Sequence, residues 1–79
     1  MQPISGVFGQ VVREERIKRG ISQEKLAQLA ELHRTYMSRI EAGQVRLGLD
    51  VAQKLAAGLG MPLSVLVAKA EERSKSSRV

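Results

Sequence analysis

The segment from Arg34 to Arg39 reads RTYMSR and has hydrogen-bonding side chains at every position but one. Arginine carries five N–H donors in a planar fork, which matches the O6 and N7 acceptors that guanine presents in the major groove of DNA. Arg34 and Arg39 are therefore the expected base-reading residues, and one bidentate contact contributes about 1–3 kcal/mol of discrimination between bases. Because Thr35 and Arg39 are four residues apart, a helix places them on one face.

Other polar residues in and after this segment extend the expected contact surface. We expect Thr35 to touch a thymine methyl group or a phosphate, and Ser38 to meet a base or a phosphate. Two interpretations of Tyr36 stay open: its ring covers the edge of the groove, or its hydroxyl reaches a phosphate. Arg46, in the loop that follows, is a candidate phosphate contact. For each of these residues the alternative is an ordinary solvated polar surface.

Two short helices joined by a tight turn are expected to position these side chains. The first spans about residues 23–30, and Ser22 is suited to cap its free N–H groups. The second spans about residues 34–42 and ends at Gly43, since glycine readily takes the left-handed conformation that terminates helices. A short helix that carries arginines and stands on a partner helix suits insertion into a DNA major groove.

The whole chain is predicted to be all-α, with five helices at about residues 5–19, 23–30, 34–42, 49–59 and 63–72. Residues 1–4 form a lead-in, residues 5–72 a compact five-helix domain, and residues 73–79 a disordered basic tail without apolar periodicity. The expected inward-facing residues are Phe8, Val11, Val12, Leu26, Leu29, Ala30, Met37, Ile40, Leu49, Ala52, Leu55, Ala56, Leu59, Leu63, Leu66 and Ala70.

Composition favours a small domain with a polyanionic partner. The 79 residues include 13 Lys and Arg against 8 Asp and Glu, a net charge of +5, and a positive balance steers a protein toward polyanions. There is no cysteine, which fits a reducing cytosol. No segment approaches the roughly eighteen apolar residues of a membrane span, and no signal peptide is evident. We expect a cytoplasmic protein that associates with the nucleoid when bound to DNA.

Catalysis is not expected from this sequence. The single histidine, His33, offers little for a nucleophile–base pair, and no Cys or second His stands near it to complete a metal site. There is no phosphate-binding glycine motif. His33 is better interpreted as a capping or phosphate-contacting residue before the second helix. No enzyme activity, metal, cofactor or small-molecule ligand is therefore expected.

The chain resembles the phage-repressor type of helix-turn-helix protein, the Cro/cI-like or XRE family, from about Phe8 to Val67. The residues that carry the resemblance are Arg16, Gly20, Ser22-Gln23-Glu24, Leu26-Ala27, Ile40-Glu41-x-Gly43 and Leu59-Gly60. Within the family, Arg34-Thr35-Tyr36-x-Ser38 is similar to the controller proteins of restriction–modification systems. The resemblance implies a DNA-binding regulator of transcription.

The resemblance also assigns roles to residues outside the second helix. It implies that Gln23 contacts a DNA phosphate through its side chain and amide, and that Arg16 pairs with Glu41. Glu15 stands where the family usually has leucine, so either Glu15 lies at the margin of the core or the first helix is slightly rotated. The family often has Pro where Leu47 stands, and a Ser or Thr cap where Gly48 stands.

The last helix has more apolar residues than one buried face needs. Val65 and Val67 are interpreted as a two-fold dimer patch, with scattered surface valines as the alternative. The expected function is a sequence-specific transcriptional regulator that binds double-stranded DNA, at a palindromic operator, as a homodimer. Two alternatives stay open: an antitoxin of the same fold that also binds a toxin protein, and a protein-interaction adaptor. RNA polymerase is a further partner if the regulator activates transcription.

Overall fold

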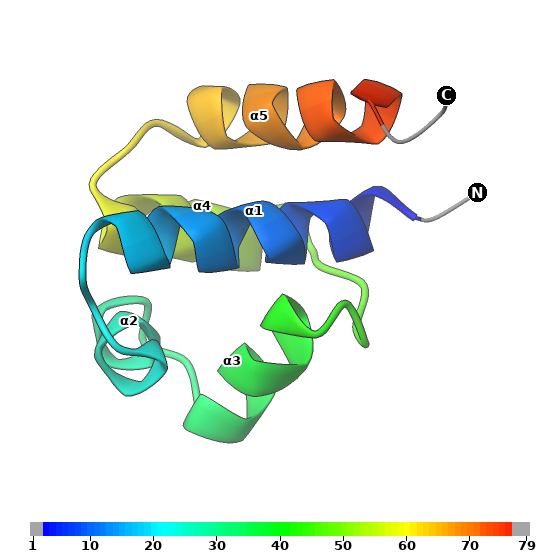
Figure 1. Cartoon of the computed structure of the whole chain (residues 1–79). Helices are drawn as coiled ribbons and strands as arrows, with labels where there is room; N and C mark the ends of the chain where they lie inside the picture. Colours follow the sequence, from blue (N-terminus) through cyan, green and yellow to red (C-terminus); the bar gives the residue numbers. More distant parts are fainter. Residues whose placement is uncertain (1–2, 77–79) are drawn as a thin grey trace.

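Five helices surround one core in the computed structural model, which describes residues 3–76. They are α1 (Ile4–Lys18), α2 (Gln23–Leu29), α3 (Arg34–Glu41), α4 (Leu49–Leu59) and α5 (Leu63–Ser76). In Figure 1, α5 lies on one side of α1, the α2–α3 pair lies on the other, and α4 lies behind α1. The all-α prediction is confirmed.

The core is aliphatic and draws on every helix. Leu26, Met37, Ile40, Leu55 and Leu66 have almost no exposed surface, and each comes from a position that the helical periodicity predicts to face inward. Full burial of one such side chain contributes about 1.5–3 kcal/mol relative to exposure. Burial of Met37 and Ile40 therefore packs the inner face of α3 against the rest of the domain.

Two leucines that we expected to be buried are exposed. Leu29 is 48% exposed and Leu49 is 77% exposed. In the short α2, Leu26, Ala27 and Ala30 define the buried arc, and a residue three positions after Leu26 falls at its edge. Leu49 is the first residue of α4 and precedes the turn that packs into the core.

The last helix is longer than predicted. It continues to Ser76, four residues beyond the expected end at Glu72, so residues 73–76 of the predicted disordered tail are helical. An ion pair between Arg73 and Glu14 of α1 joins this last part of α5 to the domain, which local periodicity does not reveal. The remaining tail residues, 77–79, lie outside the described part of the chain. At the other end, Ile4 of the predicted lead-in already belongs to α1.

Glu15 is buried at the contact between α1 and α5, with only 5% of its surface exposed. Its carboxylate lies 2.7 Å from Nη1 of Arg19, 3.2 Å from Nζ of Lys18 and 3.7 Å from Nζ of Lys69. The hydrogen bond from Arg19 and the charges of the two lysines hold the pKa of Glu15 below its ordinary value of 4.5, against the opposing effect of burial. Of the two expectations for Glu15, the structure agrees with a place at the margin of the core.

Gly9 permits the close approach of α1 to α3. A Cβ atom on this residue would lie 1.9 Å from the carbonyl oxygen of Ile40, far inside van der Waals contact. The sequence analysis did not single out Gly9. Without a side chain at this position, the backbone at the end of α3 can lie directly against α1.

None of the five helices in residues 3–76 is by itself long and apolar enough to cross a membrane. Only α4 and α5 taken together meet that test of length and composition, and the two are bent by 103° at their junction.

Candidate nucleic-acid interface

The α2–turn–α3 unit is closed by hydrogen bonds at the start of each helix. Oγ of Ser22 accepts from the backbone N–H of Lys25 at 3.0 Å, so the expected N-cap of α2 is formed. Nδ1 of His33 accepts from the backbone N–H of Thr35 at 3.2 Å, which makes His33 the cap of α3 and agrees with its interpretation as a capping residue. Gly43 follows α3 with φ 73°, in the left-handed region that ends helices.

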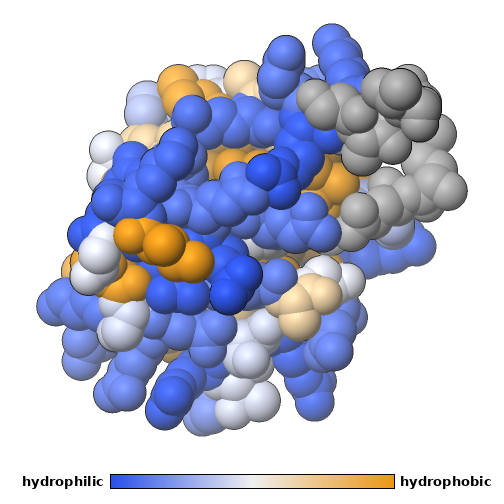
Figure 2. Space-filling model, in the orientation of Figure 1, coloured by the Kyte–Doolittle hydropathy of each residue, from blue (hydrophilic) through white to orange (hydrophobic). Residues whose placement is uncertain are grey.

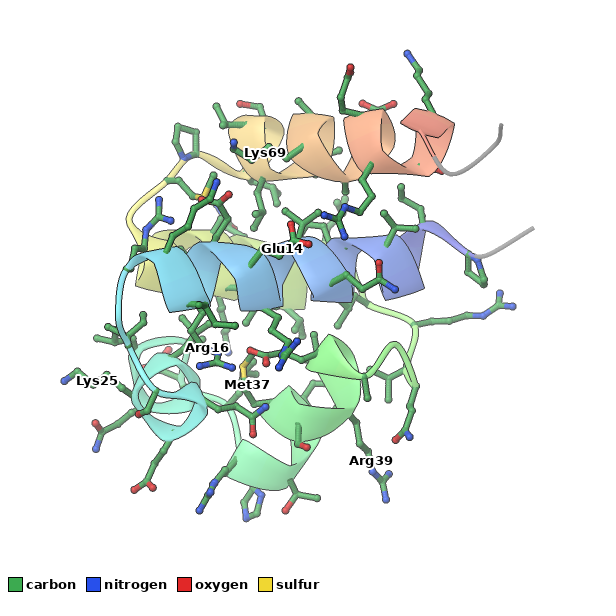
Figure 3. The ribbon with its side chains drawn as sticks, in the orientation of Figure 1. Glu14, Arg16, Lys25, Met37, Arg39 and Lys69 are labelled. Atoms are coloured by element: carbon green, nitrogen blue, oxygen red, sulfur yellow. The ribbon has the colours of Figure 1, made fainter. Side chains whose placement is uncertain are left out.

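The two faces of α3 differ sharply in burial. Met37 and Ile40 are 0% and 1% exposed, whereas Arg34, Ser38 and Arg39 are exposed to solvent. In Figure 3, Met37 points into the protein and Arg39 points away from it. The polar face of α3 is therefore free to meet a partner without disturbing the core.

Several predicted contact residues meet in one shallow depression between the starts of α2 and α3. The depression is lined by Gln23, Arg34, Thr35, Ser38 and Arg39. Figure 2 shows that the surface over these two helices is mainly hydrophilic. The exposed guanidinium and hydroxyl groups, with the half-buried amide of Gln23 beside them, can donate several hydrogen bonds at once, as DNA phosphates and base edges require.

Tyr36 and Arg46 lie outside this depression. Tyr36 is half-buried and packs partly against the core, so its ring sits at the edge of the exposed face of α3. Arg46 is exposed in the loop after α3, beside the start of α1. The backbone N–H of Leu47 donates a hydrogen bond of 3.2 Å to the side-chain Oγ of Ser5, which ties this loop to α1.

Arg16 and Glu41 form the ion pair that the resemblance implies. Nε of Arg16 lies 2.7 Å from Oε2 of Glu41 and Nη2 lies 3.0 Å from Oε1, a two-pronged contact in which the carboxylate side chain is only 3% exposed. The hydrogen bond to Glu41 raises the pKa of Arg16 above its ordinary value, so the guanidinium keeps its charge. Nη1 of Arg16 also donates to the carbonyl of Ile21 at 3.0 Å. One guanidinium thus links α1, the loop before α2 and the end of α3.

Two contacts of the α2 start were missed by the sequence analysis. Nε2 of Gln23 donates to Oε1 of Glu41 at 3.2 Å, and Oε2 of Glu24 lies 3.7 Å from Nη1 of Arg34. Both contacts join α2 to α3 across the turn. Spacing along the chain gives no signal for either, because the crossing geometry of the two helices decides them.

The two valines proposed as a dimer patch differ in exposure. Val65 is 42% exposed, whereas Val67 is partly buried against the core. Of the two, Val65 offers the larger apolar surface to a partner, and Val67 mainly supports the packing of α5.

Comparison with protein-family models matches residues 12–66 to the helix-turn-helix family HTH_3. The chain belongs to this family, of the Cro/cI or XRE type. Family members are DNA-binding regulators of transcription rather than enzymes. The described residues contain no group of three His, Cys, Asp or Glu side chains that could hold a metal ion.

The relatives of this chain include controller proteins. It is 48% identical to control protein C.BamHI from Bacillus amyloliquefaciens over 56 residues, which cover 70% of this chain and 69% of that protein. It is 38% identical to control protein C.MunI from Mycoplasma sp over 73 residues, or 91% of this chain and 99% of that protein. Among solved structures, the restriction–modification controller protein C.AhdI from Aeromonas hydrophila superposes with a TM-score of 0.74 at 41% identity, covering 77% of this chain and 92% of that one.

Proposed function

We propose that this protein is a sequence-specific transcriptional regulator that binds a palindromic operator as a homodimer, with α3 in the major groove. The observation that supports this most directly is the meeting of Gln23, Arg34, Thr35, Ser38 and Arg39 on one exposed surface. The names of its relatives support a role as the controller of a restriction–modification system. Its place of action is then the nucleoid.

The contact residues differ in the part of DNA that they are proposed to contact. Arg34 and Arg39 are proposed to read guanine, because a guanidinium fork matches O6 and N7. Gln23 and the N–H groups at the start of α2 meet a phosphate, which positions the protein without reading sequence. Thr35 and Ser38 lie between these groups and contact a thymine methyl, a base edge or a phosphate.

Tyr36 and Arg46 flank the central contacts. Because Tyr36 is half-buried at the edge of the exposed face, its ring is proposed to lie along the groove wall. Arg46 lies in the loop after α3 and is exposed, so it is proposed to contact a phosphate of the adjoining backbone. Such contacts strengthen binding to all sequences alike.

A homodimer is proposed because one α3 reads only one half-site. Two copies related by a two-fold axis place their α3 helices in successive turns of one face of DNA, about 34–36 Å apart. Val65 is the centre of the proposed dimer surface on α5, and Val67, which is partly buried against the core, contributes less apolar surface to it. A two-fold interface uses the same patch on both copies.

Selection of bound duplexes from a random pool, followed by measurement of the mass of the complex, tests this proposal. It predicts a consensus with two inverted half-sites and a complex of two protein chains per duplex. Affinity should fall steeply with salt, with log affinity decreasing by about 0.9 per phosphate contact for each unit of log salt concentration. Weak binding without any consensus would overturn the proposal.

A further inference from the structure

A carboxylate from α2 lies beside the first arginine of α3. Oε2 of Glu24 is 3.7 Å from Nη1 of Arg34, and the two side chains are 74% and 68% exposed. Neither side chain belongs to the core. An acid at this place is unexpected on a surface that approaches a polyanion, so its effect on binding needs an explanation.

We propose that Glu24 is a specificity-determining residue that acts through Arg34. It holds the Arg34 guanidinium away from phosphates on DNA of the wrong sequence, and it orients the same group toward guanine on the operator. Glu24 is thus a positioning residue and touches no base itself. This inference rests on the proposed function, because it takes Arg34 as a base reader.

Glu24 repels the DNA backbone. Glu24 follows Gln23 directly at the start of α2, where the proposed phosphate contact is made. Double-stranded DNA carries one negative charge per about 1.7 Å of its axis, and salt at physiological strength screens charges only beyond about 8 Å. The carboxylate of Glu24 therefore weakens the approach of any duplex, whatever its sequence.

Glu24 and the DNA phosphates compete for the Arg34 guanidinium. An exposed ion pair at this distance is weak, so Glu24 restrains Arg34 without locking it. On DNA of the wrong sequence, a single phosphate has to draw the guanidinium away from Glu24. On the operator, guanine offers two acceptors that match the fork, so the contact is stronger and its direction is fixed.

On the operator, Arg34 can contact Glu24 and a guanine base at the same time. A guanidinium has five N–H donors, and Oε2 of Glu24 lies 3.7 Å from one of its nitrogens, Nη1. The remaining donors stay free for a base. An arginine that is already oriented loses less side-chain entropy when it binds, so Glu24 favours the guanine contact while it opposes phosphate contacts.

The experiment compares the wild type with E24Q, R34A and the double variant E24Q/R34A. Their affinities are measured for the selected operator, for the operator with each single base pair changed, and for a duplex without the consensus. The control is E71Q, which makes the same change of charge at an exposed position on α5, the helix on the far side of α1 from α3. Thermal unfolding of each variant checks that the fold is retained.

Two effects are expected of E24Q. Its affinity for the duplex without the consensus rises about two- to fivefold more than that of E71Q, the range that one exposed charge interaction produces. Its discrimination at the base pair read by Arg34, defined as the position where R34A loses preference, falls by a similar factor. In the R34A background, removal of Glu24 still strengthens binding to the duplex without the consensus but changes discrimination at no position.

Several outcomes would overturn the inference. If E24Q and E71Q behave alike while the wild type prefers its operator, the inference fails and the proposed function stands. The same holds if E24Q strengthens binding to all duplexes equally and leaves every preference unchanged. If the wild type shows no preference for any duplex, the proposed function fails and the inference fails with it.

Discussion

The side chain of Gln23 donates a hydrogen bond of 3.2 Å from Nε2 to Oε1 of Glu41. Because an ionised carboxylate only accepts hydrogen bonds, the amide nitrogen of Gln23 must face Glu41. The first side chain of α2 is thus held by the last residue of α3. Glu41 is in turn held by Arg16 of α1, so the proposed phosphate contact is fixed by groups inside the domain.

The Arg16–Glu41 ion pair should matter strongly for stability. Arg16→Met leaves the Glu41 carboxylate buried without its charged partner, and a loss on the order of 3–5 kcal/mol in the free energy of unfolding is expected. Urea denaturation measures this loss. Arg13→Met, at an exposed position on the same helix, is the matched control and should change stability little. If both variants lose the same free energy of unfolding, the ion pair contributes no more to stability than an exposed arginine does.

Gly9 should tolerate no larger side chain. In Gly9→Ala the new Cβ would lie 1.9 Å from the Ile40 carbonyl oxygen, so α1 and α3 must move apart. Such overpacking is expected to lower the free energy of unfolding by about 1–3 kcal/mol. Thermal unfolding of the wild type and of Gly9→Ala measures this loss.

Gly58→Ala in α4 is the control for Gly9→Ala, since both substitutions place alanine inside a helix. Its Cβ would meet the end of the Leu26 side chain at 2.9 Å, a group that can adjust more easily than backbone. Alanine also gains up to about 1 kcal/mol of helix propensity over glycine. A Gly9→Ala variant as stable as Gly58→Ala would show that the close approach of α1 and α3 does not require glycine at this position.

Acid should weaken the domain partly through Glu15. The pKa of Glu15 is lowered in the folded protein, chiefly by the hydrogen bond from Arg19, so the unfolded chain takes up the proton at higher pH than the folded one. The stabilisation is therefore complete above the ordinary value of 4.5 and is lost as the pH falls through the lower folded pKa. Wild type and Glu15→Gln should differ in unfolding free energy by a constant amount above about pH 5.5, and the difference should shrink below about pH 4.5. A difference that does not change down to about pH 3 would rule out this role.

The dimer surface can be tested at Val65 without harm to the core. Val65→Asp places a charge at a position that is 42% exposed, so the monomer should stay folded while a two-fold interface would bring two like charges together. Sedimentation equilibrium should show a monomer where the wild type is a dimer. Ile17→Asp, at a residue of α1 that is 54% exposed, is the control and should leave the dimer intact. A Val65→Asp variant that still forms dimers would place the interface elsewhere.

The sequence predicts most of the fold because its helices follow local rules. Apolar periodicity finds most of the buried residues of α1 and α3 but misses Val7, which is 2% exposed. Ser22 and Gly43 mark helix ends by their own chemistry. The end of α5 escaped prediction because Arg73 finds its partner, Glu14, on another helix. Leu29 falls at the edge of the buried arc of a very short helix, where periodicity discriminates poorly.

The candidate site was predictable in its residue types and less so in its contacts. The motif at residues 34–39 indicates which side chains face outward, because a helix with one buried face must expose the other. The hydrogen bond from Gln23 to Glu41 and the approach of Glu24 to Arg34 depend on the angle between α2 and α3. Packing of the whole domain sets that angle, and no local sequence pattern reports it.

The most direct test of base reading by α3 is a specificity profile of Arg39→Ala beside the wild type. Both proteins are bound to the selected operator and to each of its single-base-pair variants at fixed salt. If Arg39 reads a guanine, the variant loses about 1–3 kcal/mol of discrimination at one position of each half-site and keeps the wild-type order of preference at all others. If Arg39→Ala instead weakens binding to every duplex by the same factor, Arg39 contacts only the backbone, and the account of sequence recognition by this face of α3 is contradicted.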